Sequence, residues 1–471
     1  MYKKHYTRNF VTKESVELIH EKSLHLLKNK GIRFSSDELL TLFKERGLRV
    51  DGEIVYFTEE IINEALASCP RNFNYVSRGK KLPVGTVQKK TIGQSSLGPI
   101  NVLQEGVHRP AMVEDYVNFI KIFHTSNVID VIDCELVYPQ NVPSEFRTDF
   151  MSLAPMMYSD KPLAGLNGSG QVSRRTIQLA KEFNDIHDQV LMSTLITSAP
   201  PFAWDRAMCE SLIEYAKGGQ CCCIAGVGLA GLTGPPSLAS NIIQNNTERL
   251  SGIVATQIVN PGAPVIYQFS ALQTDLRYSV CVCGGAETSV EWFVENELAT
   301  FYGLPKRSHG CLSDAKEDDY QAGRESALVG LSALMSEPEV SYMLAGIMDS
   351  FNTLGYEKFI LDEDTYKIAG RFLRAVEFSE ETMLIDKMEK IEHSGNYLAR
   401  TTKTYKKDFI FPDFANRKAY SNWEKEDNSI SIRERATQAW KKRLEEYVQP
   451  ELDKRQLKMV KDLLPTELRF K

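Results

Sequence analysis

Residues 308–325 read Ser308-His-Gly-Cys-Leu-Ser-Asp-Ala-Lys-Glu-Asp-Asp-Tyr-Gln-Ala-Gly-Arg-Glu325. A short strand-like run breaks here into glycine, cysteine and a dense polar cluster, and a helical pattern begins after it. Strand ends that deliver reactive side chains just before a helix are typical of α/β enzymes, which carry their functional groups on such loops. This stretch therefore predicts one strand–loop–helix unit of a catalytic α/β fold.

The same unit recurs along the chain from about residue 88, as short β-branched or small-residue runs that alternate with helix-length patterns. The predicted strands are 91–95, 128–135, 162–166, 190–197, 221–225, 265–269, 306–310 and 342–347. The predicted helices are 113–123, 146–157, 173–183, 204–217, 236–259, 288–302, 319–335 and one from 356 onward. Eight such units without a Rossmann glycine fingerprint favour a closed (β/α)8 TIM barrel over an open sheet.

The regions outside the repeats have a different character. Residues 1–87 predict a mainly helical N-terminal cap with a short strand pair near 50–57, and residues 88–385 predict the barrel. Residues 386–471 are charged and rich in helix formers. We expect this C-terminal extension to pack on the barrel or on a neighbouring subunit, and the protein to form a homo-oligomer.

Composition narrows the class of protein. A chain of 471 residues with 42% hydrophobic and 25% charged residues can bury one large core. A net charge of −6 gives no basic surface for nucleic acid. The apolar runs are shorter than a bilayer span, and the N-terminus lacks a signal-peptide apolar region. We expect a soluble, cytoplasmic protein that binds neither nucleic acid nor membrane.

The nine cysteines are an odd number and lie in apolar surroundings. This favours free buried thiols in a reducing compartment over a disulfide framework. Zinc at Cys281 and Cys283 is the competing interpretation, but the chain has no CxxC pair and no HExxH. No metal site is predicted.

Polar residues and glycines gather just after the predicted strands. In a (β/α)8 fold these positions share one rim, where active sites are built, although ordinary turns favour the same residue types. The positions are Gln94, Ser95, Glu135, Asn167, Thr197, Ser198, Gly226, Gly228, Gln268, Cys311, Asp314 and Asp349. Their convergence indicates a site more strongly than any single position does.

A glycine-rich loop between residues 226 and 236 opens a helix and resembles an anion cradle. It carries no lysine, matches neither GxxxxGK[ST] nor GxGxxG, and ends in two prolines that explain a rigid turn. We interpret Gly228, Gly231 and Gly234 as part of a wall that lets a partner surface approach the barrel mouth closely.

The chain as a whole resembles the trimethylamine methyltransferase family of corrinoid-protein methyltransferases. The segments that carry the resemblance are Gly31-Ile-Arg-Phe34, Gly231-Leu-Thr-Gly-Pro-Pro-Ser-Leu-Ala239, Gly284-Gly-Ala-Glu287, Ser313-Asp-Ala-Lys316, Gln321-Ala-Gly323 and Ala345-Gly-Ile-Met-Asp349, with His393, Pro412, Arg417 and Trp423 near the end. The resemblance implies a TIM barrel that moves a methyl group from a methylated amine to the Co(I) corrinoid of a separate partner protein.

One departure from the family's archetype concerns the substrate. The archetype has pyrrolysine in the segment that here reads His-Gly-Cys-Leu-Ser-Asp, and Cys311 is closest to that position. The chain thus resembles the non-pyrrolysine branch, whose members act on quaternary amines such as glycine betaine, proline betaine and carnitine. A quaternary ammonium already carries the charge that makes a methyl group transferable, and it leaves as a neutral tertiary amine. A special activating residue is then unnecessary.

Such a cation has no exchangeable proton, so aromatic faces and acids should hold it. Phe202 and Trp204, after the fourth strand, are the candidates for this wall, and packing of the loop is the alternative. A betaine carboxylate needs a cation or N–H donors, which Arg307 and His309 on the seventh strand supply if their face is inward. By the same alternation Cys311 shares that face and lines the methyl pocket, while a purely structural histidine fits the pattern equally well.

The remaining candidates have two interpretations each. Asp314 and Lys316 either reach the cavity or pair and brace the loop, and Glu287 is either a rim acid or a first-turn helix carboxylate. The catalytic candidates are therefore His309, Cys311, Asp314 and Glu287. The substrate-binding candidates are Phe202, Trp204, Gln268, Arg307, Lys316, Gln321, Glu325 and Asp349.

The chain lacks a cobalt-ligating DxHxxG motif, since Asp185-Ile-His187 continues with Asp-Gln-Val. We therefore expect no tightly bound cofactor and a corrinoid (cobalamin) supplied by a partner protein. Two other functions remain open on the sequence. One is a barrel lyase or aldolase with Lys316 as Schiff-base amine, and the other is a betaine-binding protein without turnover.

Overall fold

The central feature of the computed structural model, which describes residues 10–85, 90–270, 273–397 and 402–469, is a parallel eight-stranded sheet. Its strands, in chain order, are β6 (Ile92–Gly93), β9 (Ile132–Asp133), β10 (Leu163–Ala164), β11 (Met192–Thr197), β13 (Cys221–Ala225), β14 (Val265–Gln268), β17 (Lys306–Ser308) and β18 (Val340–Ser341). A parallel bridge between Gln94 and Val131, with a hydrogen bond from Ser95 N to Val131 O, joins β6 to β9. The sheet is therefore closed, and the predicted TIM barrel is confirmed.

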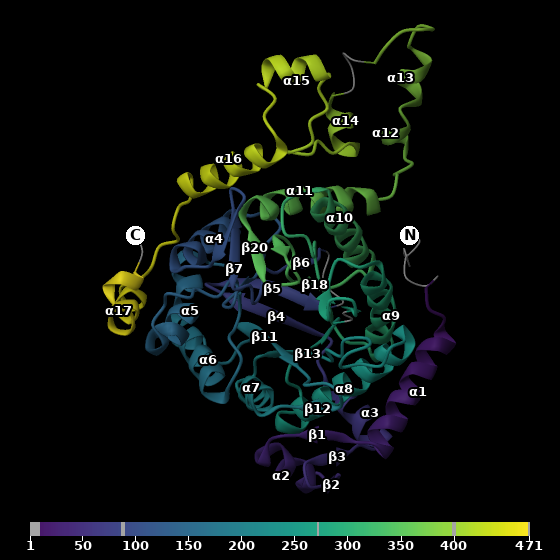
Figure 1. Cartoon of the computed structure of the whole chain (residues 1–471). Helices are drawn as coiled ribbons and strands as arrows, with labels where there is room; N and C mark the ends of the chain where they lie inside the picture. The colour runs from purple at the N-terminus through teal and green to yellow at the C-terminus, as the bar shows by residue number, and fades with distance from the viewer. Residues whose placement is uncertain (1–9, 86–89, 271–272, 398–401, 470–471) are drawn as a thin grey trace.

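Eight helices surround the strands, one after each (Figure 1). They are α4 (Val113–Thr125), α5 (Ser144–Tyr158), α6 (Gly170–Asn184), α7 (Arg206–Lys217), α8 (Leu238–Val259), α9 (Ala286–Tyr302), α10 (Tyr320–Met335) and α11 (Tyr356–Leu373). Side chains of Ser169, Asp205, Ser237 and Asp319 cap the first turns of α6, α7, α8 and α10 by accepting backbone N–H groups. These caps explain why helices begin directly after polar loops.

The eighth strand differs from its prediction at 342–347. The barrel strand is Val340–Ser341, and the chain turns at Met343, which has a left-handed φ of 48°. Ile347 belongs instead to β19 (Ile347–Met348), which pairs with β20 (Thr353–Gly355) beside β7 (Asn101–Gln104) and β8 (Val107–Pro110). The run is apolar because its loop is buried against the barrel, so its composition resembles that of a strand.

The N-terminal segment packs on α8. It contains α1 (Lys13–Asn29), α2 (Asp37–Glu45) and α3 (Glu59–Ser68) with β1 (Ile32–Phe34), β2 (Arg49–Asp51) and β3 (Ile54–Tyr56). Strand β1 pairs in parallel with β12 (Ala203–Trp204), which lies in the loop after β11. The predicted boundary at residues 87 and 88 falls outside the described residues.

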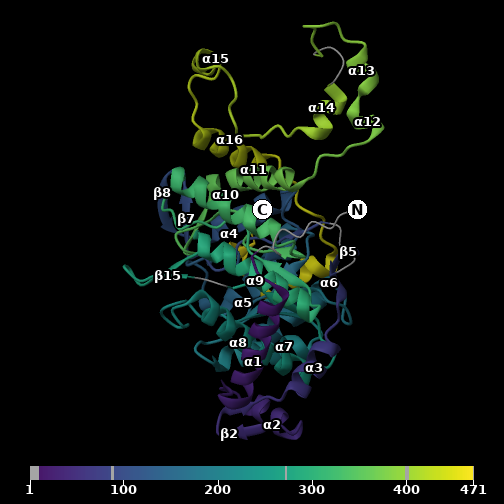
Figure 2. The ribbon, with the colours of Figure 1, turned by 90° about the vertical axis from the view of Figure 1, so that its right-hand side faces the viewer.

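A hairpin of β4 (Asn72–Ser77) and β5 (Lys80–Gly85) closes the amino end of the barrel. Tyr75 and Val84 pack there with the inward side chains Ile92, Cys221 and Val340. Figure 2 shows β5 on the side of the molecule opposite to β7, β8 and β15. The other end, where the strands finish, is left for the functional loops.

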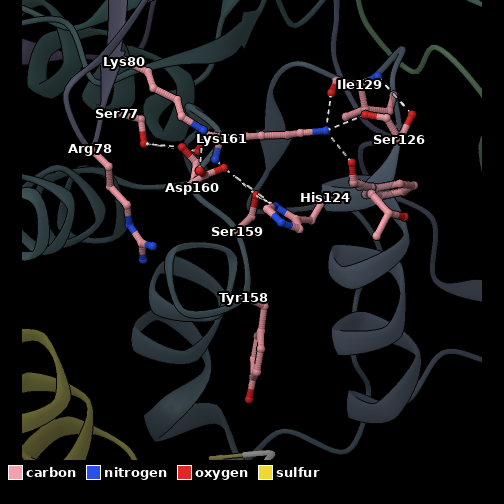
Figure 3. Close-up of polar contacts among 12 residues, drawn as sticks. Ser77, Arg78, Lys80, His124, Ser126, Ile129, Tyr158, Ser159, Asp160 and Lys161 are labelled. Carbon is pink, nitrogen blue, oxygen red and sulfur yellow. Dashed lines mark hydrogen bonds and ion pairs between the residues drawn. The ribbon is translucent and has the colours of Figure 1, made fainter. Parts of the chain in front are cut away.

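Lys161 organises the backbone beside this closed end (Figure 3). Its ammonium donates hydrogen bonds to the carbonyl oxygens of Phe123 (2.7 Å), Ser126 (2.9 Å) and Ile129 (2.5 Å). Burial lowers the pKa of Lys161 to about 8. The Phe123 carbonyl lies in the last turn of α4 and the other two lie just beyond it, so one lysine satisfies acceptors at the end of the helix.

The C-terminal extension has two parts. Helices α16 (Ile432–Glu445) and α17 (Lys454–Leu463) pack on the barrel, where Trp440 Nε1 donates to Glu357 at 2.7 Å. The preceding segment projects away from the barrel and carries α12 (Glu380–Met383), α13 (Ile385–Glu389), α14 (Thr402–Asp408) and α15 (Tyr420–Glu426) (Figures 1 and 2). In the described ranges, no helix has the length and apolar character needed to cross a bilayer.

All nine cysteines are free thiols, and eight of them are buried. Within the described parts of the chain, no group of three or more His, Cys, Asp or Glu side chains is arranged to hold a metal ion.

Candidate active site at the carboxyl end of the barrel

The alternation of side chains along the strands identifies the inner wall of the barrel. Cys223, Ile266 and Val340 belong to the cluster that fills its interior. Arg307 lies in register with both Gln268 and Val340, so Arg307 and Gln268 also point inward. His309 and Tyr342 follow two residues later, at the carboxyl ends of their strands.

One side of this wall holds buried polar groups without protein partners. Gln268 is 0% exposed, and Arg307 and His309 are 1% exposed. Among the described residues, Gln268 Oε1, Arg307 Nε and Nη1, and His309 Nδ1 have no hydrogen-bond partner. Leaving such groups unpaired costs about 1–3 kcal/mol each, so they mark a place where a ligand or water completes the structure.

His309 lies within a cluster of aromatic rings. Its ring stacks on Trp292 at 4.9 Å with an interplanar angle of 11°, and it lies 4.5 Å from Tyr342 and 6.4 Å from Phe351. The Arg307 guanidinium lies over the Tyr342 ring at 3.9 Å. Burial, followed by the charge of Arg307, lowers the pKa of His309 to about 3. The imidazole is therefore neutral at physiological pH.

The part of the barrel wall that faces these residues from across the interior is acidic and partly exposed. Asp133 is buried, and its carboxylate accepts hydrogen bonds from Gln94 Nε2 (2.9 Å) and Glu135 N (2.8 Å). Glu135, Asn167 and Thr197, which follow or end neighbouring strands, each retain partial exposure. Burial raises the pKa of Asp133 to about 8 and that of Glu135 to about 7. The site thus has an acidic side that a ligand can reach and a buried side that offers donors.

A further buried acid, Glu291, lies on α9 next to Trp292 and is 0% exposed. Neither of its oxygens has a hydrogen-bond partner in the part of the chain that the structure describes. Burial raises the pKa of Glu291 to about 8, although nearby Gln273 and Asn241 lower it in part. Glu291 and Trp292 were missed by the sequence reasoning, because buried residues on a helix resemble core positions.

Three consecutive residues with left-handed backbone form a strained turn at the mouth. Their φ angles are 51° at Asp349, 50° at Ser350 and 76° at Phe351. Lys316 pairs with Asp349 at 2.7 Å, and Ser350 Oγ donates to Asp314 at 2.9 Å. Such strain persists only where neighbours enforce it, and here it brings the Phe351 ring toward His309. Lys316 and Asp349 therefore brace a loop of the site.

Asp314 and Glu325 hold neighbouring loops together. The backbone N–H groups of Cys283 and Gly284 donate to Asp314, and Lys316 donates to its carbonyl oxygen. Glu325 accepts hydrogen bonds from Ser313 Oγ, from the Asp314 backbone at 2.8 Å and from Gln321 at 2.9 Å. These contacts match the bracing alternative for Asp314. Gln321 and Glu325 stabilise the same loop.

Cys311 faces away from His309, so the prediction that the two share a face is wrong. Its thiol is buried beside Gly330 of α10 and lies 3.9 Å from the Asp362 carbonyl of α11. Strand β17 ends at Ser308, and the backbone at Gly310 packs tightly on Leu344. The strand alternation therefore stops before Cys311 is reached.

The two aromatic residues predicted as a cation wall have occupied faces. Trp204 is 0% exposed, donates to Ser251 at 2.9 Å and stacks near Phe34 at 6.3 Å. The Phe202 ring lies under the Lys30 ammonium at 4.9 Å. These contacts fit the packing alternative for both residues, most clearly for the fully buried Trp204. Glu287 is exposed in the first turn of α9, which matches its helix-dipole alternative.

The glycine-rich loop lies tightly against α8. Gly228 N donates to Asn245 at 2.7 Å, and Gly234 leaves no space for a Cβ beside Asn241. Gly231, with φ of 84°, contacts Leu276 in the hairpin of β15 (Gln273–Asp275) and β16 (Val280–Val282). This loop and the hairpin together form one edge of the mouth.

Comparison with known proteins relates the whole chain to one family and one fold. The family described as trimethylamine methyltransferase (MTTB) matches residues 2–466. Glycine betaine methyltransferase of Desulfitobacterium hafniense (strain Y51) is 31% identical over 452 residues, covering 94% of each chain. Proline betaine:corrinoid and L-carnitine:corrinoid methyltransferases of Eubacterium limosum are each 31% identical over 98% of both chains. The crystal structure of Methanosarcina barkeri monomethylamine methyltransferase (MtmB) has a TM-score of 0.51 at 12% identity, over 94% of each chain, so it shares the fold.

Proposed function

Because the chain belongs to the trimethylamine methyltransferase (MTTB) family, we propose that it transfers a methyl group from a quaternary amine to the Co(I) corrinoid of a separate protein. The single observation that best supports binding of a zwitterionic donor is the charge arrangement at the carboxyl end of the barrel, where acids lie on one side and the buried, unpaired nitrogen atoms of Arg307 and His309 lie on the other. A carboxylate suits such nitrogen donors, and an onium group suits the acidic side.

The reaction is an in-line displacement. The Co(I) electron pair attacks the methyl carbon, the carbon–nitrogen bond breaks, and its electrons stay on nitrogen as a neutral tertiary amine leaves. A methyl–Co(III) corrinoid results. No proton moves, so the chain's residues need only orient the donor and exclude water. The outward position of Cys311 supports a mechanism without a covalent enzyme intermediate.

We assign the donor's other end to the buried donors of the site. Arg307 and His309 carry unpaired N–H or ring nitrogen atoms that suit a carboxylate of the betaine type, and Gln268 lies in register beside Arg307. Betaine-type donors also agree with the names of the glycine betaine, proline betaine and carnitine relatives.

The acceptor corrinoid is a second substrate, delivered by a cognate corrinoid protein. We place the docking surface on the mouth edge formed by Gly228, Gly231 and Gly234 and by the β15–β16 hairpin. Leu232 is 55% and Tyr278 is 71% exposed on this edge. Apolar groups exposed side by side at a site's entrance are typical of protein interfaces.

We also propose that the protein is a homo-oligomer. From residue 374 to 431, no side chain that the structure describes is buried, and Phe378 is 82% exposed. The α10–α11 flank beside this arm exposes Tyr320 and Phe372. Since one chain carries both an apolar arm and an apolar flank, the arm of one copy can cover the flank of another. Sizing in solution tests this, and a clean monomer would refute it.

The lyase or aldolase alternative gains no support from the site. Lys316, the Schiff-base candidate, has a 68% exposed side chain and is ion-paired with Asp349 outside the buried wall. A Schiff-base lysine is normally desolvated so that its amine is uncharged.

Methyl transfer tests the proposal directly. The protein is incubated with free cob(I)alamin and, separately, with glycine betaine, proline betaine, carnitine or trimethylamine. We expect methylcobalamin absorbance to grow with at least one quaternary amine and not with trimethylamine. Growth with trimethylamine alone, or with none of the amines, would overturn the assignment. In the second case, a thermal shift with a betaine would identify a binding protein without turnover.

A further inference from the structure

We propose that Glu135 is the counter-ion of the donor's onium group. Glu135 and Arg307, on opposite sides of the barrel interior, then bind the positive and negative ends of a zwitterion. This inference rests on the proposed function and names the residue that makes the enzyme select a cationic donor. In the sequence, Glu135 is one of many polar residues that follow strands.

The backbone places Glu135 at the carboxyl end of β9, on the rim of the barrel. Cys134 N continues the sheet by bonding to Ala164 O, and the Tyr116 hydroxyl of α4 donates to the Cys134 carbonyl from outside the barrel. The Cys134 side chain is in the outer core, whereas Val131, three residues earlier, fills the interior. Glu135 follows in the turn after β9, where its partly exposed side chain lies beside the Asn167 backbone at the end of the neighbouring strand, and its own carbonyl accepts from Gly98 N at 2.8 Å.

Strand order places Arg307 across the interior from Glu135. In the closed ring, β18 and β6 separate β17, which carries Arg307, from β9, which leads to Glu135. Three steps in a ring of eight strands come close to the opposite wall. Acid and guanidinium thus lie on well-separated parts of the barrel wall, as the two ends of a zwitterion require.

Glu135 is the better of the two acids on its wall. Asp133 is 1% exposed, and both of its oxygens already accept hydrogen bonds. Glu135 keeps partial exposure, with the Asn167 backbone at one side and the similarly exposed Leu195 and Thr197 close by in the ring. An onium group offers no N–H, so it is held by charge and apolar contact, which this combination of residues supplies.

The protonation of Glu135 supports the assignment. Burial raises the pKa of Glu135 to about 7, so near neutral pH part of the Glu135 side chains are protonated and uncharged. A bound cation favours the carboxylate and lowers that pKa, so binding must release a fraction of a proton. A neutral donor of the same shape would release none.

Isothermal titration tests the inference without the reaction. The titrants are whichever of glycine betaine, proline betaine and carnitine the wild type binds best, and its isostere with carbon in place of the quaternary nitrogen. We expect the wild type to prefer the betaine at least tenfold. Glu135→Gln should lose at least tenfold in betaine affinity and change less than twofold for the isostere. Titrations near pH 7 in buffers of different ionisation enthalpy should show proton release only in the wild type.

Matched variants separate charge from shape. Glu135→Asp keeps the charge and should retain the preference for the betaine, while Glu145→Gln, on the exposed first turn of α5, should behave like the wild type. Arg307→Met should weaken the betaine and the isostere equally, since both keep the carboxylate. Equal losses for both titrants in Glu135→Gln, or no loss, would overturn the inference. The predicted binding pattern without methyl transfer to cob(I)alamin would refute the function and leave the inference standing.

Discussion

At the scale of single residues, the site depends on polar side chains whose ionisation is set by burial. His309 combines a buried ring, the nearby Arg307 charge and aromatic neighbours, and these hold it neutral. A neutral imidazole can line a cation site and still donate or accept one hydrogen bond. Substitutions here should therefore change pH dependence as well as affinity.

The first prediction concerns His309 and acid stability. Its folded pKa of about 3 is below the ordinary value of 6.5, so the unfolded chain takes up the proton first as the pH falls. The stability that His309 contributes is present above pH 6.5 and is lost as the pH falls from there toward 3. We expect the stability difference between wild type and His309→Gln to shrink by up to about 1.4 kcal/mol per pH unit in this window. Urea unfolding at pH 8, 6, 5 and 4 measures it. A constant difference, or an equal trend in the exposed control His187→Gln, would contradict the prediction.

The second prediction concerns Trp204. Its indole packs between the N-terminal segment and α8, so Trp204→Phe loses the bond to Ser251 and some packing. We expect a loss of about 1–3 kcal/mol in unfolding free energy with no change in betaine affinity. Denaturant unfolding measures the unfolding free energy, and titration of the same protein sample measures the betaine affinity. A large loss of affinity at unchanged stability would restore Trp204 to the cation wall.

At the scale of elements, much of the fold could be predicted because the signals are local. Helix α8 was expected at 236–259 and is Leu238–Val259, and α9 was expected at 288–302 and is Ala286–Tyr302. Caps and periodicity lie within each helix, so one sequence suffices. The eighth strand was misplaced because a buried loop and a buried strand have the same apolar composition, and only distant pairing distinguishes them.

The site was less predictable than the elements for a related reason. Gln268 was expected on the rim, and Arg307 and His309 were expected to bind a carboxylate if their face is inward; the structure places Gln268 and Arg307 in register on the inner wall, with His309 at the end of the same strand as Arg307. Cys311 was misplaced because the tight backbone contact of Gly310 with Leu344, thirty-four residues away in the chain, ends the alternation. Phe351 enters the site through a strained turn held by Lys316 and Asp314, which no local pattern reveals.

The third prediction tests the lysine that completes a helix end. Lys161→Met removes the lysine donor from the carbonyl oxygens of Phe123, Ser126 and Ile129 at the end of α4, of which Phe123 keeps the bond from Ser126 N (Figure 3). We expect a loss of roughly 2–4 kcal/mol in unfolding free energy, since each buried unpaired acceptor costs about 1–3 kcal/mol and water repairs part of it. Chemical denaturation measures this loss. The half-buried control Lys181→Met loses one carbonyl contact and should cost less. Equal losses in unfolding free energy for the two variants would show that the three-carbonyl contact of Lys161 does not stabilise the fold more than an ordinary lysine contact does.

At the scale of the whole molecule, the two ends of the barrel have separate tasks. The β4–β5 hairpin closes the amino end, whereas the carboxyl end carries the acids, the aromatic cluster and the strained turn. Helix α16 joins α11 to the loops of that end, because Trp440 bonds to Glu357 and Arg433 lies 3.7 Å from Asp318. A partner that approaches the site must therefore do so from the mouth, past the β15–β16 hairpin.

The last prediction follows from that approach. Leu276 and Tyr278 are 64% and 71% exposed on the hairpin, while Leu276 also contacts Gly231 of the facing loop. If the corrinoid protein docks here, the double change Leu276→Ser and Tyr278→Ser removes two apolar anchors, each worth more than about 1 kcal/mol. We expect kcat/KM for the corrinoid protein to fall at least tenfold, while the rate with free cob(I)alamin and the betaine affinity stay unchanged. The control Val448→Ser, an exposed apolar residue between α16 and α17, should change neither rate. An equal loss with free cob(I)alamin would move the hairpin from the docking surface to the substrate site, and no loss at all would place docking elsewhere on the rim.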